Sequence, residues 1–177
     1  FMSMGAVLFR TGTIKGSELG GLYKTMPYTT GFCMIGAASI SAFPLFSGFI
    51  SKGIILYAVA EEGHWIIWLV LLFASAGVLD HSGIKVPFFS FFAHDQHHKC
   101  KEAPLNMLLA MGMTAAACIL IGIFPSVLYQ WLPHEMDFHP YTFDHIITQL
   151  QLLFFAALAF VVLFRNGWYP AEIKSII

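Results

Sequence analysis

Charge is the scarcest property of this sequence. Only 11% of its 177 residues are Asp, Glu, Lys or Arg, whereas 58% are hydrophobic and the mean hydropathy is +0.73. In a soluble domain about a quarter of the residues are charged. The composition therefore excludes an ordinary soluble domain and predicts an integral membrane protein.

Several local signatures are also missing. The sequence shows no phosphate-binding glycine loop, no nucleophile elbow and no basic patch of the kind that binds nucleic acid. Its three cysteines are far apart, so no disulfide framework follows. Arg10 follows the apolar run from Phe1 to Phe9 instead of preceding it, which is not the order of a secretory signal. We expect no cofactor, no nucleic-acid partner and no self-contained enzyme.

The apolar residues gather in five segments that suit a membrane. A bilayer core of about 30 Å needs about 20 helical residues. The first segment starts at Phe1 rather than Met and is short, so we expect it to be the second half of a helix. An all-α polytopic bundle follows, in which 1–177 is the C-terminal part of one transmembrane domain. The expected spans are residues 1–10, 29–60, 65–86, 104–124 and 146–164.

The basic residues test this map, because loops rich in Lys and Arg stay on the cytoplasmic side during insertion. Eight of the nine Lys and Arg residues fall on alternate connections, and the connections between them carry acidic residues instead. This pattern predicts a cytoplasmic C-terminus and leaves only Lys52 unexplained. The eight residues are Arg10, Lys15, Lys24, Lys85, Lys99, Lys101, Arg165 and Lys174.

The segment 29–60 is too long to be one straight helix. Its 32 residues would extend about 48 Å. Pro44 lacks a backbone donor and clashes with the preceding turn, and Ser47 and Gly48 follow it closely. We therefore expect a discontinuous helix. Irregular backbone at membrane depth is tolerated where protein or a water-filled cavity surrounds it, which points to an ion path.

Lys52 lies about two turns beyond Pro44, inside the same apolar segment. An ammonium at that depth costs several kcal/mol on insertion scales, about 3 at the helix centre, unless it is paired, hydrated or neutral. One interpretation is a proton carrier, because burial makes a lysine easier to deprotonate. The alternative is a lysine that extends its stem to the membrane interface. The neighbouring helix break favours the first.

Five stretches of the sequence resemble the antiporter-like subunits shared by Mrp-type multisubunit cation/proton antiporters and respiratory complex I. The element Gly-Phe-x-Ser-Lys on a Pro-broken helix carries most of this resemblance, and the later stretches look like the D-type antiporter subunits. In that family the residue matching Lys52 is the last member of a chain of buried Lys, His and Glu residues that passes protons. The stretches are Leu19 to Pro27, Ala42 to Lys52, His81 to Asp95, Lys101 to Met107 and Thr148 to Gln151.

This resemblance implies a function. We expect a subunit of a monovalent cation (Na⁺)/proton antiporter in a bacterial inner membrane, with further subunits, the lipid bilayer, protons and Na⁺ as its partners. One alternative is the proton-pumping membrane subunit of an NADH-quinone oxidoreductase-like complex. A third is a structural membrane subunit without a transport path of its own.

Three further groups of polar residues are weaker candidates. Asp80 and His81 form either a proton-uptake relay or the polar end of a helix. The cluster of His94, His97, His98 and Cys100 contains metal-ligand types, but its spacing is not that of a standard zinc site, so an ordinary polar loop is expected. His134, His139 and His145, with Glu135 and Asp137, are interpreted as a solvated external loop.

Overall fold

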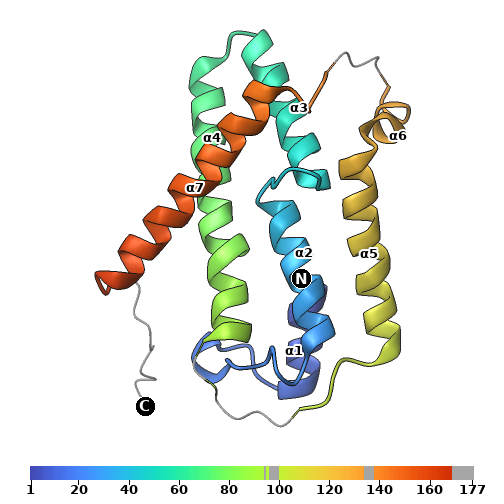
Figure 1. The fold of residues 1–177 in the computed structure, drawn as a ribbon, viewed down its shortest axis with the longest axis vertical. Helices are drawn as coiled ribbons and strands as arrows, with labels where there is room; N and C mark the ends of the chain where they lie inside the picture. Colours follow the sequence, from blue (N-terminus) through green and yellow to red (C-terminus); the bar gives the residue numbers. More distant parts are fainter. Residues whose placement is uncertain (94, 96–99, 134–137, 169–177) are drawn as a thin grey trace.

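The computed structural model describes residues 1–93, 95, 100–133 and 138–168, and every regular element in them is helical (Figure 1). This confirms the all-α prediction. The elements are α1 (Met2–Thr11), η1 (Gly16–Glu18), α2 (Pro27–Ile40), α3 (Ser47–Glu61), α4 (Trp65–Val78), η2 (Leu79–Lys85), η3 (Phe88–Phe92), α5 (Leu105–Ile123), α6 (Pro125–Tyr129) and α7 (Phe143–Arg165).

Three helices of the described chain are long and apolar enough to cross a membrane. They are Trp65–Phe92, Leu105–Ile123 and Phe143–Arg165. The connection from α1 to α2 and the start of α5 lie at one end of the bundle, and the turn from α3 to α4 lies with the start of α7 at the other (Figure 1). The helix α7 crosses α4 obliquely.

The helix that begins at Trp65 runs to Phe92, six residues past the expected end of the span at residue 86. Pro87 lies in its interior. Proline normally ends or kinks a helix because it lacks an N–H and its ring meets the carbonyl four residues earlier. Here the π-helical segments η2 and η3 flank Pro87, so the hydrogen-bond pattern is already shifted on both sides and the helix continues.

The predicted interruption is present between α2 and α3, which lie nearly end to end in the middle of the bundle (Figure 1). Residues 41–46, here called the helix break, contain Pro44 and are not helical. Ala42 has φ 58° and Leu45 has φ 74°, a region that residues with a β-carbon rarely adopt. Each costs on the order of 1–3 kcal/mol, so surrounding contacts must hold the break in place.

The most compact core lies at the end of the bundle where α1 meets α2. Leu22, Met26 and Phe91 are fully buried there and pack with Val7 of α1 and Met111 of α5. This cluster ties the α1–α2 connection to the end of the Trp65–Phe92 helix and to α5. The cluster holds these elements together at the end of the bundle where α2 begins, and α2 runs from there to the break.

Glu102 supplies the cap that starts α2. Its Oε2 accepts the Tyr28 N–H at 2.9 Å, and its Oε1 accepts the Thr29 hydroxyl at 2.6 Å and the Ala103 N–H at 2.9 Å. The first turn of a helix has unpaired N–H groups and a partial positive charge, so a carboxylate stabilises it. Glu102, which lies more than seventy positions after Tyr28 in the sequence, thus stabilises the start of α2.

Candidate functional site

The side chain of Lys52 turns back toward the helix break. Its Nζ donates to the Ile40 carbonyl at 2.6 Å and to the Ser75 hydroxyl of α4 at 3.1 Å. The side chain is half-buried. Lys52 therefore joins three elements: its own helix α3, the last residue of α2 and the last turn of α4.

The ammonium occupies a position that the geometry of α2 makes favourable. Ile40 is the last residue of α2, where carbonyls lack helical partners and the helix dipole is negative. The next carbonyl, that of Ser41, lies 3.5 Å from Nε2 of Gln149, a buried residue of α7. Side chains of α3 and α7 thus hold the carbonyl groups that the break releases.

Three glycines allow neighbouring helices to pack closely at the break and at the end of α2 beside it. A β-carbon at Gly48 of α3 would overlap the Ser39 carbonyl, one at Gly83 of η2 would overlap the Ser41 hydroxyl, and one at Gly122 of α5 would overlap the Leu45 carbonyl. The hydroxyls of Ser39 and Ser47 lie 3.0 Å apart across the break. The sequence links Gly48 to the break because it follows Pro44 closely, but it does not predict the contacts of Gly83 and Gly122, whose partners lie in distant segments.

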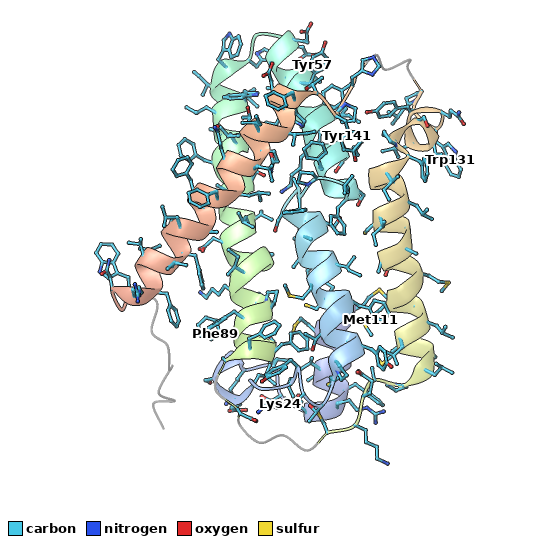
Figure 2. The ribbon with its side chains drawn as sticks, in the orientation of Figure 1. Lys24, Tyr57, Phe89, Met111, Trp131 and Tyr141 are labelled. Atoms are coloured by element: carbon cyan, nitrogen blue, oxygen red, sulfur yellow. The ribbon has the colours of Figure 1, made fainter. Side chains whose placement is uncertain are left out.

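Tyr141 closes the site from the segment before α7. Figure 2 labels Tyr141 beside the upper part of the bundle. Its hydroxyl donates to the Gly122 carbonyl, and its ring stacks on Phe49 of α3 with centroids 5.6 Å apart. Burial raises the pKa of Tyr141, which keeps the phenol protonated and able to donate. No sequence signal marked this tyrosine, since its role depends on where α5 ends.

Asp80 and His81 are adjacent in the π-helical segment η2, which packs against α2 and α7. Asp80 is half-buried and its Oδ1 is buried, whereas His81 is exposed. The two side chains thus occupy different environments, and their joint role in a relay stays a prediction.

The suggested metal-ligand cluster falls mainly outside the described residues, since His94, His97 and His98 are not among them. Cys100 is described: its Sγ lies 3.5 Å from the Thr25 hydroxyl. Within the described ranges, no group of three His, Cys, Asp or Glu residues could hold a metal ion.

The interpretation of the external loop needs one correction. His134, Glu135 and Asp137 lie outside the described residues. His145, however, is not a loop residue: it lies in the first turn of α7 and its ring packs against Phe49 of α3. The sequence pattern missed this because α7 begins at Phe143, three residues before the expected start of the span at residue 146.

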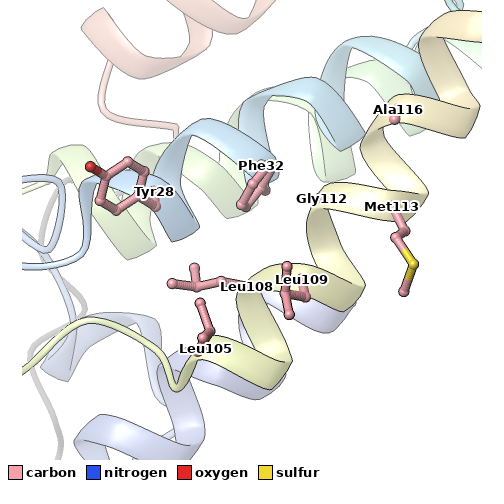
Figure 3. Close-up of a pocket in the computed structure, with 8 residues that line it drawn as sticks. All are labelled: Tyr28, Phe32, Leu105, Leu108, Leu109, Gly112, Met113 and Ala116. Atoms are coloured by element: carbon pink, nitrogen blue, oxygen red, sulfur yellow. The ribbon is translucent and has the colours of Figure 1, made fainter.

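An open apolar groove of about 550 Å³ lies between α2 and α5, at some distance along α2 from the break (Figure 3). Its lining offers almost no polar surface that could hold an ion. It is therefore separate from the polar site at Lys52. The lining residues are Tyr28, Phe32, Leu105, Leu108, Leu109, Gly112, Met113 and Ala116.

The fold and the site together define a polytopic membrane protein with a lysine at a broken helix. Comparison with known protein families gives a match: the family described as NADH:quinone oxidoreductase/Mrp antiporter, TM, matches residues 1–77. The first 77 residues of the chain are thus similar to this family of membrane proteins. The matched region contains α1, α2, the helix break and Lys52.

Some relatives are named as Na⁺/H⁺ antiporter subunits, and others as a hydrogenase component or an NADH-quinone oxidoreductase subunit. The chain is 32% identical over 143 residues to the Na⁺/H⁺ antiporter subunit A1 of Staphylococcus haemolyticus, which covers 73% of this chain and 18% of that protein. It is 31% identical over 146 residues to hydrogenase-4 component B of Escherichia coli (76% and 22%) and 28% identical over 168 residues to NADH-quinone oxidoreductase subunit L of Campylobacter jejuni (89% and 27%). The chain thus spans about a fifth to a quarter of the length of these relatives.

Proposed function

We propose that the chain is part of a subunit of a monovalent cation (Na⁺)/proton antiporter and takes part in proton translocation. The observation that carries this proposal is the placement of the Lys52 ammonium on the Ile40 carbonyl at the helix break. A titratable group with helix-end carbonyls around it is the arrangement that membrane proteins use at ion paths. The relatives named as Na⁺/H⁺ antiporter subunits support the choice of reaction.

The mechanism that we propose depends on how the break responds to the charge of Lys52. When Lys52 is protonated, its positive charge balances the negative end of α2. When the proton leaves, that charge balance is lost and the hydration of the break changes. The site thus couples the binding and release of one proton to a change in the charge balance and hydration of the break. Asp80 and His81 would pass protons between Lys52 and the cytoplasmic end.

The setting of the protein is also a proposal. We place it in a bacterial inner membrane with a cytoplasmic C-terminus, because the connections that carry Lys and Arg alternate along the chain. Its relatives are named as subunits, which supports assembly with partner subunits. The sequence resemblance of the later stretches favours the D-type branch of the antiporters, whereas the antiporter relative named above and a second one from Alkalihalophilus pseudofirmus are subunits of type A. The proposed activity is secondary transport, without a chemical reaction catalysed by this chain.

The second candidate is a proton-pumping subunit of a redox-driven complex. It is favoured by the relatives named hydrogenase-4 component B and NADH-quinone oxidoreductase subunit L. In that case the same Lys52 site would move protons without exchanging Na⁺. A third candidate, a structural subunit with no path, predicts that Lys52 and Pro44 can be replaced without any effect on flux.

The deciding experiment is Na⁺-induced collapse of a pH gradient in everted vesicles that contain the complete complex. Wild type is compared with Lys52→Met, and Lys24→Met serves as the matched control because Lys24 is an exposed lysine at the end of the bundle. We expect Lys52→Met to assemble but to lose the Na⁺ response, and Lys24→Met to keep it. A wild-type complex with no Na⁺ response would favour the redox pump. If Lys52→Met responds to Na⁺ like wild type, the proton path does not use Lys52.

A further inference from the structure

A histidine of α7 lies directly against the helix that carries Lys52. His145 is the third residue of α7, and its ring centroid lies 4.8 Å from that of Phe49 and 5.9 Å from that of Phe138. Phe138 in turn lies 5.2 Å from Tyr57. Phe49 and Phe138 therefore flank this imidazole, and Tyr57 packs against Phe138, on the side of the bundle where α3 turns into α4.

Gly53 brings the imidazole to the α3 backbone. A β-carbon built at Gly53 would lie 3.0 Å from Nε2 of His145, which is closer than such atoms normally approach. A β-carbon at this position would force the His145 ring, or the Phe138 ring beside it, to shift by a few tenths of an ångström. Because Gly53 directly follows Lys52, the imidazole meets α3 at the residue next to the proposed proton carrier.

The nitrogen at this contact has no hydrogen-bond partner within the described residues. Nε2 of His145 is buried, although every imidazole nitrogen can donate or accept a hydrogen bond. A buried polar atom without a partner costs about 1–3 kcal/mol, and such atoms in native structures call for an explanation. Packing alone would be served better by a phenylalanine, which has no nitrogen to satisfy.

The ionisable residues on the surrounding elements are few. The imidazole itself contacts aromatic rings and Gly53 in the described structure. The titratable groups carried by the elements around it are Lys52, Tyr57 and Glu61 of α3, His139 and Tyr141 of the preceding segment, Asp144 and Arg165 of α7, and Asp80, His81 and Lys85 of η2.

We propose that His145 is a second proton-exchange residue of the pathway, one that carries protons between Lys52 and the α3–α4 end of the bundle. This inference rests on the proposed function of Lys52. Nζ of Lys52 contacts the Ile40 carbonyl and the Ser75 hydroxyl rather than the imidazole, so the proton would pass through water. In the outward direction, an N–H bond of the Lys52 ammonium breaks as its proton goes to that water, and the water gives a proton to Nε2, which leaves a neutral amine and an imidazolium. The imidazolium then releases its proton to water at the α3–α4 end.

Two features suit His145 to this step. Imidazole exchanges protons near neutral pH, with an unperturbed pKa of about 6.5. The rings of Phe49 and Phe138 lie within the distance at which aromatic π systems favour a cation, so they can support a transient imidazolium. The basic-residue pattern predicts that the α3–α4 end is external, so His145 would be the outer residue of the path and Lys52 the inner one.

The test uses the complete complex in everted vesicles and measures the initial rate of Na⁺-induced pH-gradient collapse between about pH 6.5 and pH 9, with assembly checked by blotting. His145→Gln keeps hydrogen-bonding capacity but cannot carry a proton, and Gly53→Ala displaces the ring without altering it. His64→Gln is the control, because His64 is an exposed histidine in the α3–α4 turn. We expect His145→Gln to slow collapse about tenfold or more and to change the pH profile.

The remaining outcomes separate the two proposals. Gly53→Ala should slow collapse less than His145→Gln does, with an unchanged amount of complex, and His64→Gln should behave like wild type. If His145→Gln and Gly53→Ala both assemble and keep the wild-type rate and pH profile while Lys52→Met abolishes the response, His145 is not on the path and only this inference fails. If Lys52→Met is also as active as wild type, the proposed function of the site fails with it.

Discussion

Gly122 of α5 lies so close to Leu45 of the helix break that no β-carbon fits between them. The carbonyl of Gly122 also accepts the hydroxyl of Tyr141, so the same residue touches the break on one side and the α7 segment on the other. A single glycine therefore connects three parts of the chain that are far apart in sequence.

Gly122→Ala should destabilise the complex. The added methyl group would force the break away from α5, and overpacking of this kind costs about 1–3 kcal/mol. We expect a lower melting temperature, measured as the loss of monodisperse complex after heating in detergent. Gly36→Ala is the matched control, because nothing lies within 4 Å of a β-carbon at Gly36 in the middle of α2. Equal melting temperatures for the two variants would contradict the tight contact at Gly122.

Lys52→Arg separates the structural role of Lys52 from proton exchange. A guanidinium can still donate to the Ile40 carbonyl, but it does not release its proton in proteins. We expect the variant to assemble and melt within a few degrees of wild type, and to lose about 90% or more of the Na⁺-induced gradient collapse. Wild-type transport by Lys52→Arg would show that the site needs a fixed positive charge and not a mobile proton.

Glu102→Ala should weaken the start of α2. It removes the acceptor for the Tyr28 N–H and the Thr29 hydroxyl, and loss of a cap costs about 1 kcal/mol. The expected result is faster amide exchange in the first turn of α2, followed by mass spectrometry, with little change at the helix break. Glu61→Ala is a control at an exposed acidic residue, and the cap assignment would be wrong if both variants exchanged alike.

The ion pair between Lys24 and Asp95 should matter only up to strongly alkaline pH. Its atoms lie 2.9 Å apart, and the hydrogen bond and charge of Asp95 raise the pKa of Lys24 above its ordinary value of 10.5. A raised lysine pKa stabilises the fold below the unfolded value, and this contribution disappears as pH rises through the folded value. Lys24→Met should therefore differ from wild type by the same small melting shift at about pH 7 and pH 9, and should converge with it only as pH rises beyond the raised pKa of Lys24. A shift that already vanishes by pH 9 would rule out this assignment.

The sequence was informative where chemistry is local. Pro44 and Gly48 predict the break because proline and glycine act on their own backbone, and Lys52 is conspicuous because few charges surround it in the apolar segment. The contacts that Gly83, Gly122 and Tyr141 make at this site could not be predicted, since each partner lies more than eighteen positions away in the sequence. His145 was assigned to a loop because polar neighbours hid the first turn of α7. The continuation of the Trp65 helix past Pro87 was missed because the surrounding π-helical turns leave no clear pattern.

The interrupted helix also constrains how the chain enters the membrane. At 1.5 Å per residue, the 14 residues of α2 and the 15 of α3 each extend little more than about 20 Å, which is less than the thickness of the hydrocarbon core. Neither half can be inserted by itself, so the translocon must accept both as one unit, with a lysine and six irregular residues inside it. That unit has its polar backbone covered only when α4, α5 and α7 have been synthesised. This interrupted crossing is thus completed by the helices that follow it, which makes late helix assembly a condition for its stable insertion.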